Sequence, residues 1–141
     1  MLHSNVLRKV GTISRIVASR SDQKFKKYDL QKGQHIFVVR ICEHPGLNLM
    51  ELTQMLHVDK STTTKAVQKL EKAGYVRKAH PDDNRKSLSL YPTEQAKQVY
   101  EALLAEENVQ VDLCFDGFSE AEKKQALEFL ERMCRNIETY R

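Results

Sequence analysis

Hydrophobic residues recur every three or four positions along most of the chain, the spacing at which side chains share one face of an α-helix. The first such stretch covers about residues 4 to 28, where a narrow stripe is formed by Val6, Val10, Ile13 and Val17. So thin a stripe on so long a helix slightly favours packing against helices of a partner over packing within one chain. Both interpretations stay open at this point.

Three shorter helices are predicted next. The second covers residues 32 to 44, with Ile36, Val39 and Phe37 as candidates for its inward side, and stops at the His44-Pro45-Gly46 sequence. The third presents an apolar side made of Leu49, Leu52, Met55 and Leu56. After a turn at residues 57 to 60, Asp59 or Ser61 is suited to cap the fourth helix, which ends at Ala73 and Gly74.

The pattern changes after Gly74. Residues 75 to 78 and 87 to 90 are predicted to form two strands joined by the polar turn Pro81-Asp82-Asp83-Asn84. Thr93 then opens a long helix that ends near Cys114, and Ser119 with Glu122 forms a capping box before the last helix. The last helix has one apolar side, made of Ala126, Leu127, Leu130, Cys134 and Ile137. Helix, turn, helix and hairpin in this order predict a mainly α-helical, winged helix-turn-helix fold with a small β-hairpin wing.

The fourth helix has two chemically different faces. At 100° per residue, one face collects Thr63, Ala66, Val67, Leu70 and Ala73, and the opposite side is polar. Hydroxyls near a helix N-terminus bond phosphate, and Lys and Gln reach base edges, so this side is a candidate major-groove reader. The candidate DNA contacts on it are Ser61, Thr62, Thr64, Lys65, Gln68 and Lys69. A solvated helix with ordinary N-terminal Ser and Thr explains the pattern equally well.

The hairpin adds cations beside that helix. The candidate DNA contacts of the wing are Arg77, Asp83, Arg85 and Lys86. An Arg at a hairpin tip suits a narrow minor groove, and Asp83 is placed to hold the Arg85 guanidinium extended. Any single hairpin of this kind is more often a solvated charged turn, so the argument depends on the helix and the wing occurring together.

Charge is divided unevenly along the 141 residues. Residues 1 to 48 carry 9 basic and 3 acidic groups, residues 49 to 100 carry 9 and 6, and residues 101 to 141 carry 5 and 10. The first two thirds therefore suit a polyanion, while the acidic last third suits another role. The length predicts one domain over residues 1 to 141. No apolar run approaches the roughly 18 residues of a membrane helix, and no secretory signal opens the chain, so we expect a cytoplasmic protein without membrane contact.

Nothing in the sequence favours an enzyme. There is no Gly-rich phosphate loop, no paired nucleophile and base, and no cofactor motif. The three cysteines, Cys42, Cys114 and Cys134, lack metal-ligand spacing and are expected to be reduced and mostly buried. The five histidines all precede the two long C-terminal helices, which counts against a metal site there.

From Leu30 to Ala96 the chain resembles the MarR family of bacterial transcriptional regulators. The resemblance in the helices is carried by Leu30, Gln34, Pro45-Gly46, Leu52, Leu56, Val58, Ser61 to Thr64, Val67, Leu70-Glu71 and Gly74. In the wing it is carried by Val76, Arg77, Asp83-Asn84-Arg85 as the family's Asp-x-Arg, Leu90 and Thr93. The chain departs from the family's Leu-Thr and Gly after the wing, because Tyr91-Pro92 precedes Thr93 and Ala96 stands near the Gly position.

The resemblance implies a homodimer on a pseudo-palindromic operator, with half-sites about one helical turn apart, roughly 10 bp. Residues 30 to 92 would bind double-stranded DNA, and residues 1 to 29 and 93 to 141 would form the dimer. It also implies a repressor released by a small aromatic or phenolic effector, in a pocket that includes Ile13, His35, Val39 and Tyr100. The alternative is a winged-helix protein-interaction module whose basic face binds an acidic partner.

Overall fold

The computed structural model describes residues 1–80 and 88–140. By its internal contacts the chain divides into two compact units, Met1–Glu106 and Glu107–Arg141, and we describe each by itself. The first unit holds every element of the predicted winged helix-turn-helix. The second holds the end of one long helix and the whole of the last.

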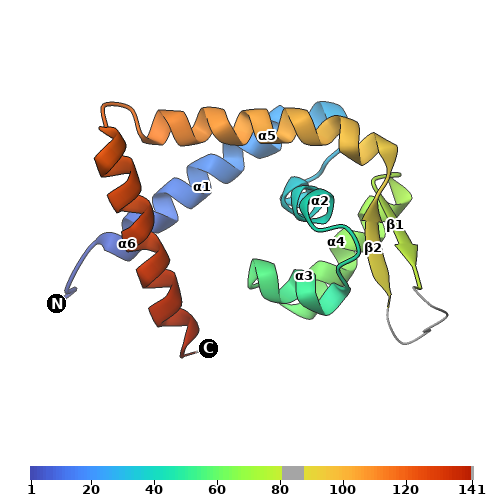
Figure 1. Cartoon of the computed structure of the whole chain (residues 1–141), viewed down its shortest axis with the longest axis horizontal. Helices are drawn as coiled ribbons and strands as arrows, with labels where there is room; N and C mark the ends of the chain where they lie inside the picture. Colours follow the sequence, from blue (N-terminus) through green and yellow to red (C-terminus); the bar gives the residue numbers. More distant parts are fainter. Residues whose placement is uncertain (81–87, 141) are drawn as a thin grey trace. The chain divides into compact units, whose positions relative to one another are not determined.

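The order of elements is the predicted one (Figure 1). The helices before the hairpin are α1 (Val6–Lys24), the 3-10 helix η1 (Lys26–Tyr28), α2 (Gln34–Glu43), α3 (Leu49–Leu56) and α4 (Lys60–Lys72). The hairpin strands are β1 (Val76–Ala79) and β2 (Ser89–Pro92), and the helices after them are α5 (Glu94–Cys114) and α6 (Glu120–Glu138). The mainly helical, winged helix-turn-helix fold class is therefore confirmed.

The two strands pair in antiparallel fashion, with Arg77 opposite Tyr91. The segment after α2 is bonded to the other edge of β2: the Gly46 N–H donates to the Leu90 carbonyl, and the Leu90 N–H donates to the Leu47 carbonyl, both at 2.8 Å. These bonds satisfy backbone groups that an edge strand would leave unpaired. They also tie the base of the wing to the connection between α2 and α3.

One hydrophobic core joins the helix-turn-helix to the hairpin. Leu52 of α3, Leu70 of α4 and Leu90 of β2 are each completely buried in it. The ring of Tyr75 lies in the same core, and its hydroxyl donates to the Tyr28 carbonyl. Burying a large apolar side chain contributes about 1.5–3 kcal/mol, so these residues fix the relative positions of α3, α4 and the wing.

Helix α2 is buried differently from the prediction. Ile36 was expected to face inward, but its side chain is exposed, whereas Phe37, Val38 and Ile41 are buried. The expectation assumed that α2 is a surface helix with a single buried hydrophobic stripe. In the structure α2 contacts α3, α4 and β2, so neighbours cover most of its circumference and only the side at Ile36 and Arg40 faces outward.

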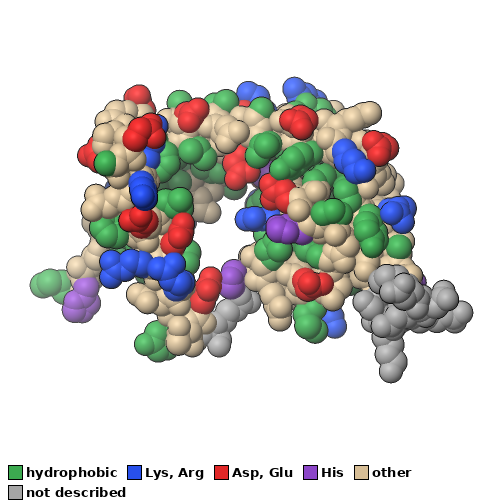
Figure 2. All heavy atoms as spheres, in the orientation of Figure 1, with side chains coloured by type: hydrophobic (Ala, Val, Ile, Leu, Met, Phe, Trp, Pro, Cys, Tyr) green, Lys and Arg blue, Asp and Glu red, His purple; other side chains and the backbone are tan. Residues whose placement is uncertain are grey.

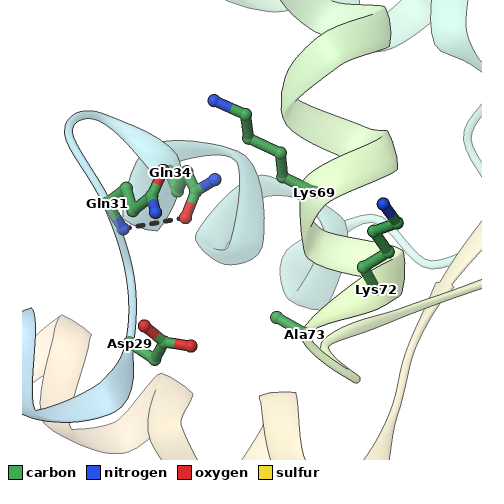
Figure 3. Close-up of a pocket in the computed structure, with 6 residues that line it drawn as sticks. All are labelled: Asp29, Gln31, Gln34, Lys69, Lys72 and Ala73. Atoms are coloured by element: carbon green, nitrogen blue, oxygen red, sulfur yellow. Dashed lines mark hydrogen bonds between the residues drawn. The ribbon is translucent and has the colours of Figure 1, made fainter.

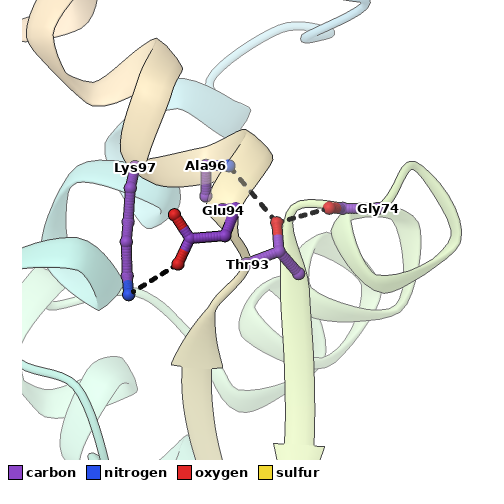
Figure 4. Close-up of polar contacts among 5 residues, drawn as sticks. All are labelled: Gly74, Thr93, Glu94, Ala96 and Lys97. Atoms are coloured by element: carbon purple, nitrogen blue, oxygen red, sulfur yellow. Dashed lines mark hydrogen bonds and ion pairs between the residues drawn. The ribbon is translucent and has the colours of Figure 1, made fainter.

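The turn between α4 and β1 is bonded to the start of α5 (Figure 4). Gly74 has a φ of +87°, which glycine adopts without strain, and its neighbours close a Schellman motif: Tyr75 N–H donates to the Leu70 carbonyl and Gly74 N–H to that of Glu71. The Thr93 hydroxyl donates to the Gly74 carbonyl at 2.6 Å and accepts from the Ala96 N–H at 3.2 Å. The predicted start of the long helix is thus confirmed, although Tyr91-Pro92 replaces the family's usual residues.

Helix α1 packs lightly within its unit. Val6, Val10 and Ile13 are all 40% exposed or more, and among α1 residues only Ser21 is buried. Near its C-terminal end, Lys24 Nζ lies 3.3 Å from Glu106 Oε2, which links α1 to α5. The N-terminal two thirds of the hydrophobic stripe therefore faces solvent in the single chain.

Hydrophobic side chains are also exposed in the second unit (Figure 2). Helix α6 begins with the predicted capping box of Ser119 and Glu122, and no residue of it is buried. Leu127, Leu130 and Ile137 are exposed, as are the thiols of Cys114 and Cys134. The expectation of mostly buried cysteines is wrong for this single chain, because nothing in the described unit covers these helix faces. Among the described residues, no helix has the length and apolar character needed to cross a bilayer.

We predict that Thr93→Val lowers the free energy of unfolding by about 1–2 kcal/mol, because it removes both the N-cap acceptor and the bond to Gly74. Thr139→Val is the matched control, since that hydroxyl bonds only the Arg135 carbonyl in an exposed last turn. The control should change stability by less than about 0.5 kcal/mol. Urea unfolding at one fixed protein concentration measures both. Equal losses in the two variants would contradict the role assigned to Thr93.

Candidate nucleic-acid interface

The N-terminus of α4 is capped by Asp59. Its carboxylate Oδ1 accepts from the Thr62 N–H at 2.8 Å and from the Ser61 hydroxyl at 3.1 Å. Hydrogen bonds from Thr62 first, and then from Ser61, hold the pKa of the Asp59 carboxyl below its ordinary value. Of the two candidate caps that the sequence offered, Asp59 is therefore the cap, and Ser61 supports it.

The buried side of α4 is the predicted one. Thr63, Val67 and Leu70 are buried, with Ala66 and Ala73 half-buried beside them. The hydroxyls of Thr63 and Thr53 lie 2.8 Å apart, which gives α4 and α3 a polar contact inside an apolar interface. Because both the core and this bond fix the rotation of α4 about its axis, the opposite side of the helix is presented in one orientation.

The six residues predicted to meet DNA lie on that opposite side and its flanks. Ser61, Thr62, Lys65, Gln68 and Lys69 are exposed and Thr64 is half-buried. The Thr64 hydroxyl donates to the Lys60 carbonyl at 2.9 Å, and the Ser61 hydroxyl donates to the Asp59 carboxylate. Both hydroxyls are therefore hydrogen-bonded within α4 and its cap. Lys65 and Gln68 are adjacent on the outward side, at positions i and i+3.

The flanks of α4 face different neighbours. On one flank, Glu71 Oε1 lies 3.4 Å from Lys78 Nζ on β1. On the other, Lys69 lines a cavity beside the loop that precedes α2. Lys69 is therefore farther to the side than Lys65 or Gln68. The sequence pattern alone placed these residues in one group, because it gave no information on what lies next to each flank.

The wing is described only at its base. Arg77 is exposed on β1, and its guanidinium carbon lies 4.8 Å from the centroid of the Tyr91 ring, a cation–π contact across the strand pair. The other wing residues that we predicted, Asp83, Arg85 and Lys86, lie outside the described residues. Tyr91 was missed as a partner of Arg77, because the second strand was predicted at residues 87 to 90, whereas β2 covers Ser89–Pro92.

The four residues predicted for an effector pocket lie in different environments. Ile13 is exposed and Val39 is buried. The His35 ring lies 5.1 Å from that of Phe25, and burial lowers the pKa of His35 against the opposing effect of Asp22. The Tyr100 hydroxyl donates to Glu43 Oε2 at 2.8 Å, which raises the pKa of Tyr100 to about 12.

Two described cavities lie elsewhere. One is lined by Asp29, Gln31, Gln34, Lys69, Lys72 and Ala73, and the other by Asn48, Leu49, Met50, Thr53, Gln54, Lys60 and Leu88. The effector pocket therefore stays a prediction.

The thiol and metal chemistry is limited. Burial raises the pKa of the Cys42 thiol to about 11, with Glu43 adding to the shift, so the thiol is protonated near neutral pH. Over residues 1–80 and 88–140, no group of three His, Cys, Asp or Glu side chains is placed to hold a metal ion.

The chain is similar to known helix-turn-helix regulators. The model of the MarR family matches residues 30–88. The HTH-type transcriptional regulator YybA of Bacillus subtilis is 37% identical over 135 residues, which cover 96% of this chain and 90% of YybA. The similarity therefore reaches well beyond the helix-turn-helix into the flanking helices.

Solved structures show the same fold. A MarR protein from Peptoclostridium difficile is 50% identical, with a TM-score of 0.94, over 99% of this chain and 92% of that one. A MarR family transcriptional regulator from Listeria monocytogenes, solved in complex with a 26mer DNA, is 35% identical, with a TM-score of 0.92, over 95% and 89% of the two chains. The arrangement of α3, α4 and the hairpin is thus shared with a regulator crystallised on DNA.

The Asp59 cap predicts a pH dependence. A folded pKa below the unfolded value means that the charged cap adds stability above the unfolded pKa, and that this stability is lost as pH falls through the folded pKa. Asp59→Asn keeps the capping geometry without the charge, so it should be less stable than wild type at pH 7 and should match it at the lowest pH. Chemical unfolding between pH 7 and pH 2 measures the difference. Asp112→Asn, which removes a carboxylate within α5 rather than at a helix N-terminus, is the control for the loss of one negative charge.

Proposed function

Because this chain belongs to the MarR family of DNA-binding transcriptional regulators, which are not enzymes, we propose that it is a homodimeric repressor acting on a pseudo-palindromic operator. The observation that carries the proposal is the division of α4 into a buried side at Thr63, Val67 and Leu70 and an outward polar side at Lys65 and Gln68. A helix anchored on one side and polar on the other suits the major groove.

The outward side of α4 has the chemistry to read a duplex. Lys65 and Gln68 have the length and donors to reach base edges, and Gln matches adenine in the major groove. Ser61, Thr62 and Thr64 lie in the first turns of the helix, where its dipole favours a phosphate. Lys69, on the flank, suits a contact to the backbone. Each phosphate neutralised in this way releases counterions, so affinity should fall steeply with salt.

The wing is proposed to add a second contact. Arg85 and Lys86, with Asp83 orienting the guanidinium of Arg85, suit the minor groove beside the half-site. Their role rests on the Asp-x-Arg match to the family, because they lie outside the described residues. Arg77 is held over the Tyr91 ring at the base of the hairpin, where a phosphate rather than a base edge is the natural target.

A homodimer would cover the hydrophobic side chains that the single chain exposes. Val6, Val10 and Ile13 of α1 and Leu127 and Leu130 of α6 are exposed at positions spaced for one helix face. Monomeric proteins seldom expose apolar stripes of this length. The proposed dimer-forming portions are residues 1 to 29 and 93 to 141, which leaves residues 30 to 92 to bind DNA.

Release by a small aromatic or phenolic effector is part of the proposal. The candidate contacts are Ile13 of α1, His35 and Val39 of α2, and Tyr100 of α5, so they come from the winged portion and from the helices before and after it. A ligand among them would bind where the dimer-forming helices meet α2, and would act by favouring one arrangement of the two. Adding such compounds to the DNA complex tests this directly. A cytoplasmic location completes the proposal.

Binding to the upstream region of its own operon should be saturable and salt-sensitive. Lys65→Ala and Arg85→Ala should each weaken it by about tenfold, since a groove contact contributes roughly 1–3 kcal/mol. Arg132→Ala, an exposed cation on α6, is the matched control and should change affinity less than about twofold. Fluorescence anisotropy at several salt concentrations gives the affinities. Random DNA or heparin bound as tightly as the promoter would favour the protein-interaction module instead.

The dimer is tested by mass in solution. Sedimentation equilibrium should give twice the 16.3 kDa of one chain. Val10→Asp places a charge in the exposed stripe of α1 and should weaken association at least about tenfold, because a buried unpaired charge is costly. Met50→Asp makes the same change at an exposed site on α3 and should stay dimeric. A wild-type monomer, or dissociation in both variants, would refute the assignment of α1 to the interface.

A further inference from the structure

A cavity of about 310 Å³ opens on one flank of α4, beside the loop that leads into α2 (Figure 3). It is lined by Asp29, Gln31 and Gln34 from the loop and α2, and by Lys69, Lys72 and the C-cap residue Ala73 of α4. Five of these six residues have polar or charged side chains, and the six come from two parts of the chain that are far apart in the sequence. Only Lys69 of these residues takes part in the proposed reading of DNA.

Gln34 provides a fixed donor in this cavity. Its side chain is only 7% exposed, and its amide oxygen accepts from the Gln31 N–H at 2.8 Å. Because that bond uses the amide oxygen, the NH2 group at the other end of the amide is the donor that faces the cavity. Figure 3 shows its nitrogen turned toward α4. A buried amide held in this way is a ready donor to an oxygen that enters the cavity.

The electrostatics of the cavity favour a negative charge. Lys69 and Lys72 leave α4 one turn apart on the cavity side, and both are exposed. Helix α2 begins beside the cavity at Gln34, but the N–H of its N-cap residue Gly33 already donates to the Asp22 carboxylate at 3.0 Å, so the two lysines supply the positive charge of the cavity. The negative charge of Asp29 counteracts the positive charges of the two lysines, but among the ion pairs of the described residues none joins Asp29 to either lysine.

We propose that this cavity is an anion-binding site that holds a phosphate or carboxylate group between Lys69, Lys72 and the Gln34 amide. Two sources supply such a group: a phosphate of the DNA backbone beside α4, or a small free anion. A free anion would occupy the charge of Lys69, which the proposed DNA interface also uses, and would thereby weaken DNA binding. The site itself requires no DNA, and only the choice between the two sources rests on the proposed function.

Inorganic phosphate is the first probe, used without DNA and at constant ionic strength. In the 15N-labelled full chain, the side-chain amide resonances of Gln34 should shift saturably at millimolar phosphate. Lys72→Gln should raise the Kd about threefold, and Asp29→Asn should lower it about threefold, since one charge beside a solvent-accessible anion is removed in each case. Asp29 has a φ of 58°, which Asn also adopts readily, so this variant changes charge without adding strain.

Lys32→Gln is the matched control. Lys32 is exposed and lies in the same loop, but it does not line the cavity. Its loss should leave the phosphate Kd unchanged. A Gln34 resonance that does not respond to phosphate, or a Lys32→Gln effect as large as that of Lys72→Gln, would overturn the site.

Operator DNA then identifies the source. If a backbone phosphate fills the site, DNA should abolish the response of Gln34 to phosphate, and Lys72→Gln should reduce the slope of log affinity against log salt by about 0.9. If a free anion fills it, the response should persist in the complex at a higher phosphate Kd, because the competition for Lys69 is reciprocal, and the salt slope of Lys72→Gln should stay unchanged. Absence of operator binding by the wild type would refute the proposed function, and the phosphate titration alone would then decide whether the cavity binds an anion.

Discussion

Leu70 of α4, Leu52 of α3 and Leu90 of β2 are completely buried in one hydrophobic core, and the position of the helix-turn-helix relative to the wing depends on this core. The core joins two helices and the hairpin. The hydrogen bond between the Thr53 and Thr63 hydroxyls restricts how α3 and α4 pack against each other, because a hydrogen bond is directional and apolar packing is not. The outward side of α4 is polar because its side chains lie outside this core and face solvent.

Backbone bonds at the margins of the core hold the wing in the same way. Thr93 links the start of α5 to the turn at Gly74, and Gly46 and Leu47 bond the free edge of β2. The long helix therefore leaves the winged portion from a fixed point. These few bonds connect the start of α5 to the turn after α4, and the segment after α2 to the base of the hairpin.

Basic residues and exposed hydrophobic residues are concentrated in different parts of the chain. Most basic residues, 18 of 23, lie within residues 1 to 100, and the exposed apolar side chains are concentrated on α1 and the C-terminal helices. An acidic C-terminal third is suited to stay off a polyanion. Helix α4 also carries cations on its flank, where Lys69 and Lys72 line a cavity together with the buried Gln34 of α2.

The sequence by itself determined the order of the elements, the cap at Ser119, the glycine turn at Gly74, and which side of α4 is buried, and it narrowed the cap of α4 to Asp59 or Ser61. These follow from local rules: capping, helical periodicity and the conformational freedom of glycine act over a few residues. Only the tertiary structure decided that Ile36 faces outward, that Tyr91 lies under Arg77, and that Lys69 borders a cavity with Gln34. Each of these depends on neighbours far away in the sequence, because burial and electrostatic surroundings are properties of packed elements rather than of any one of them.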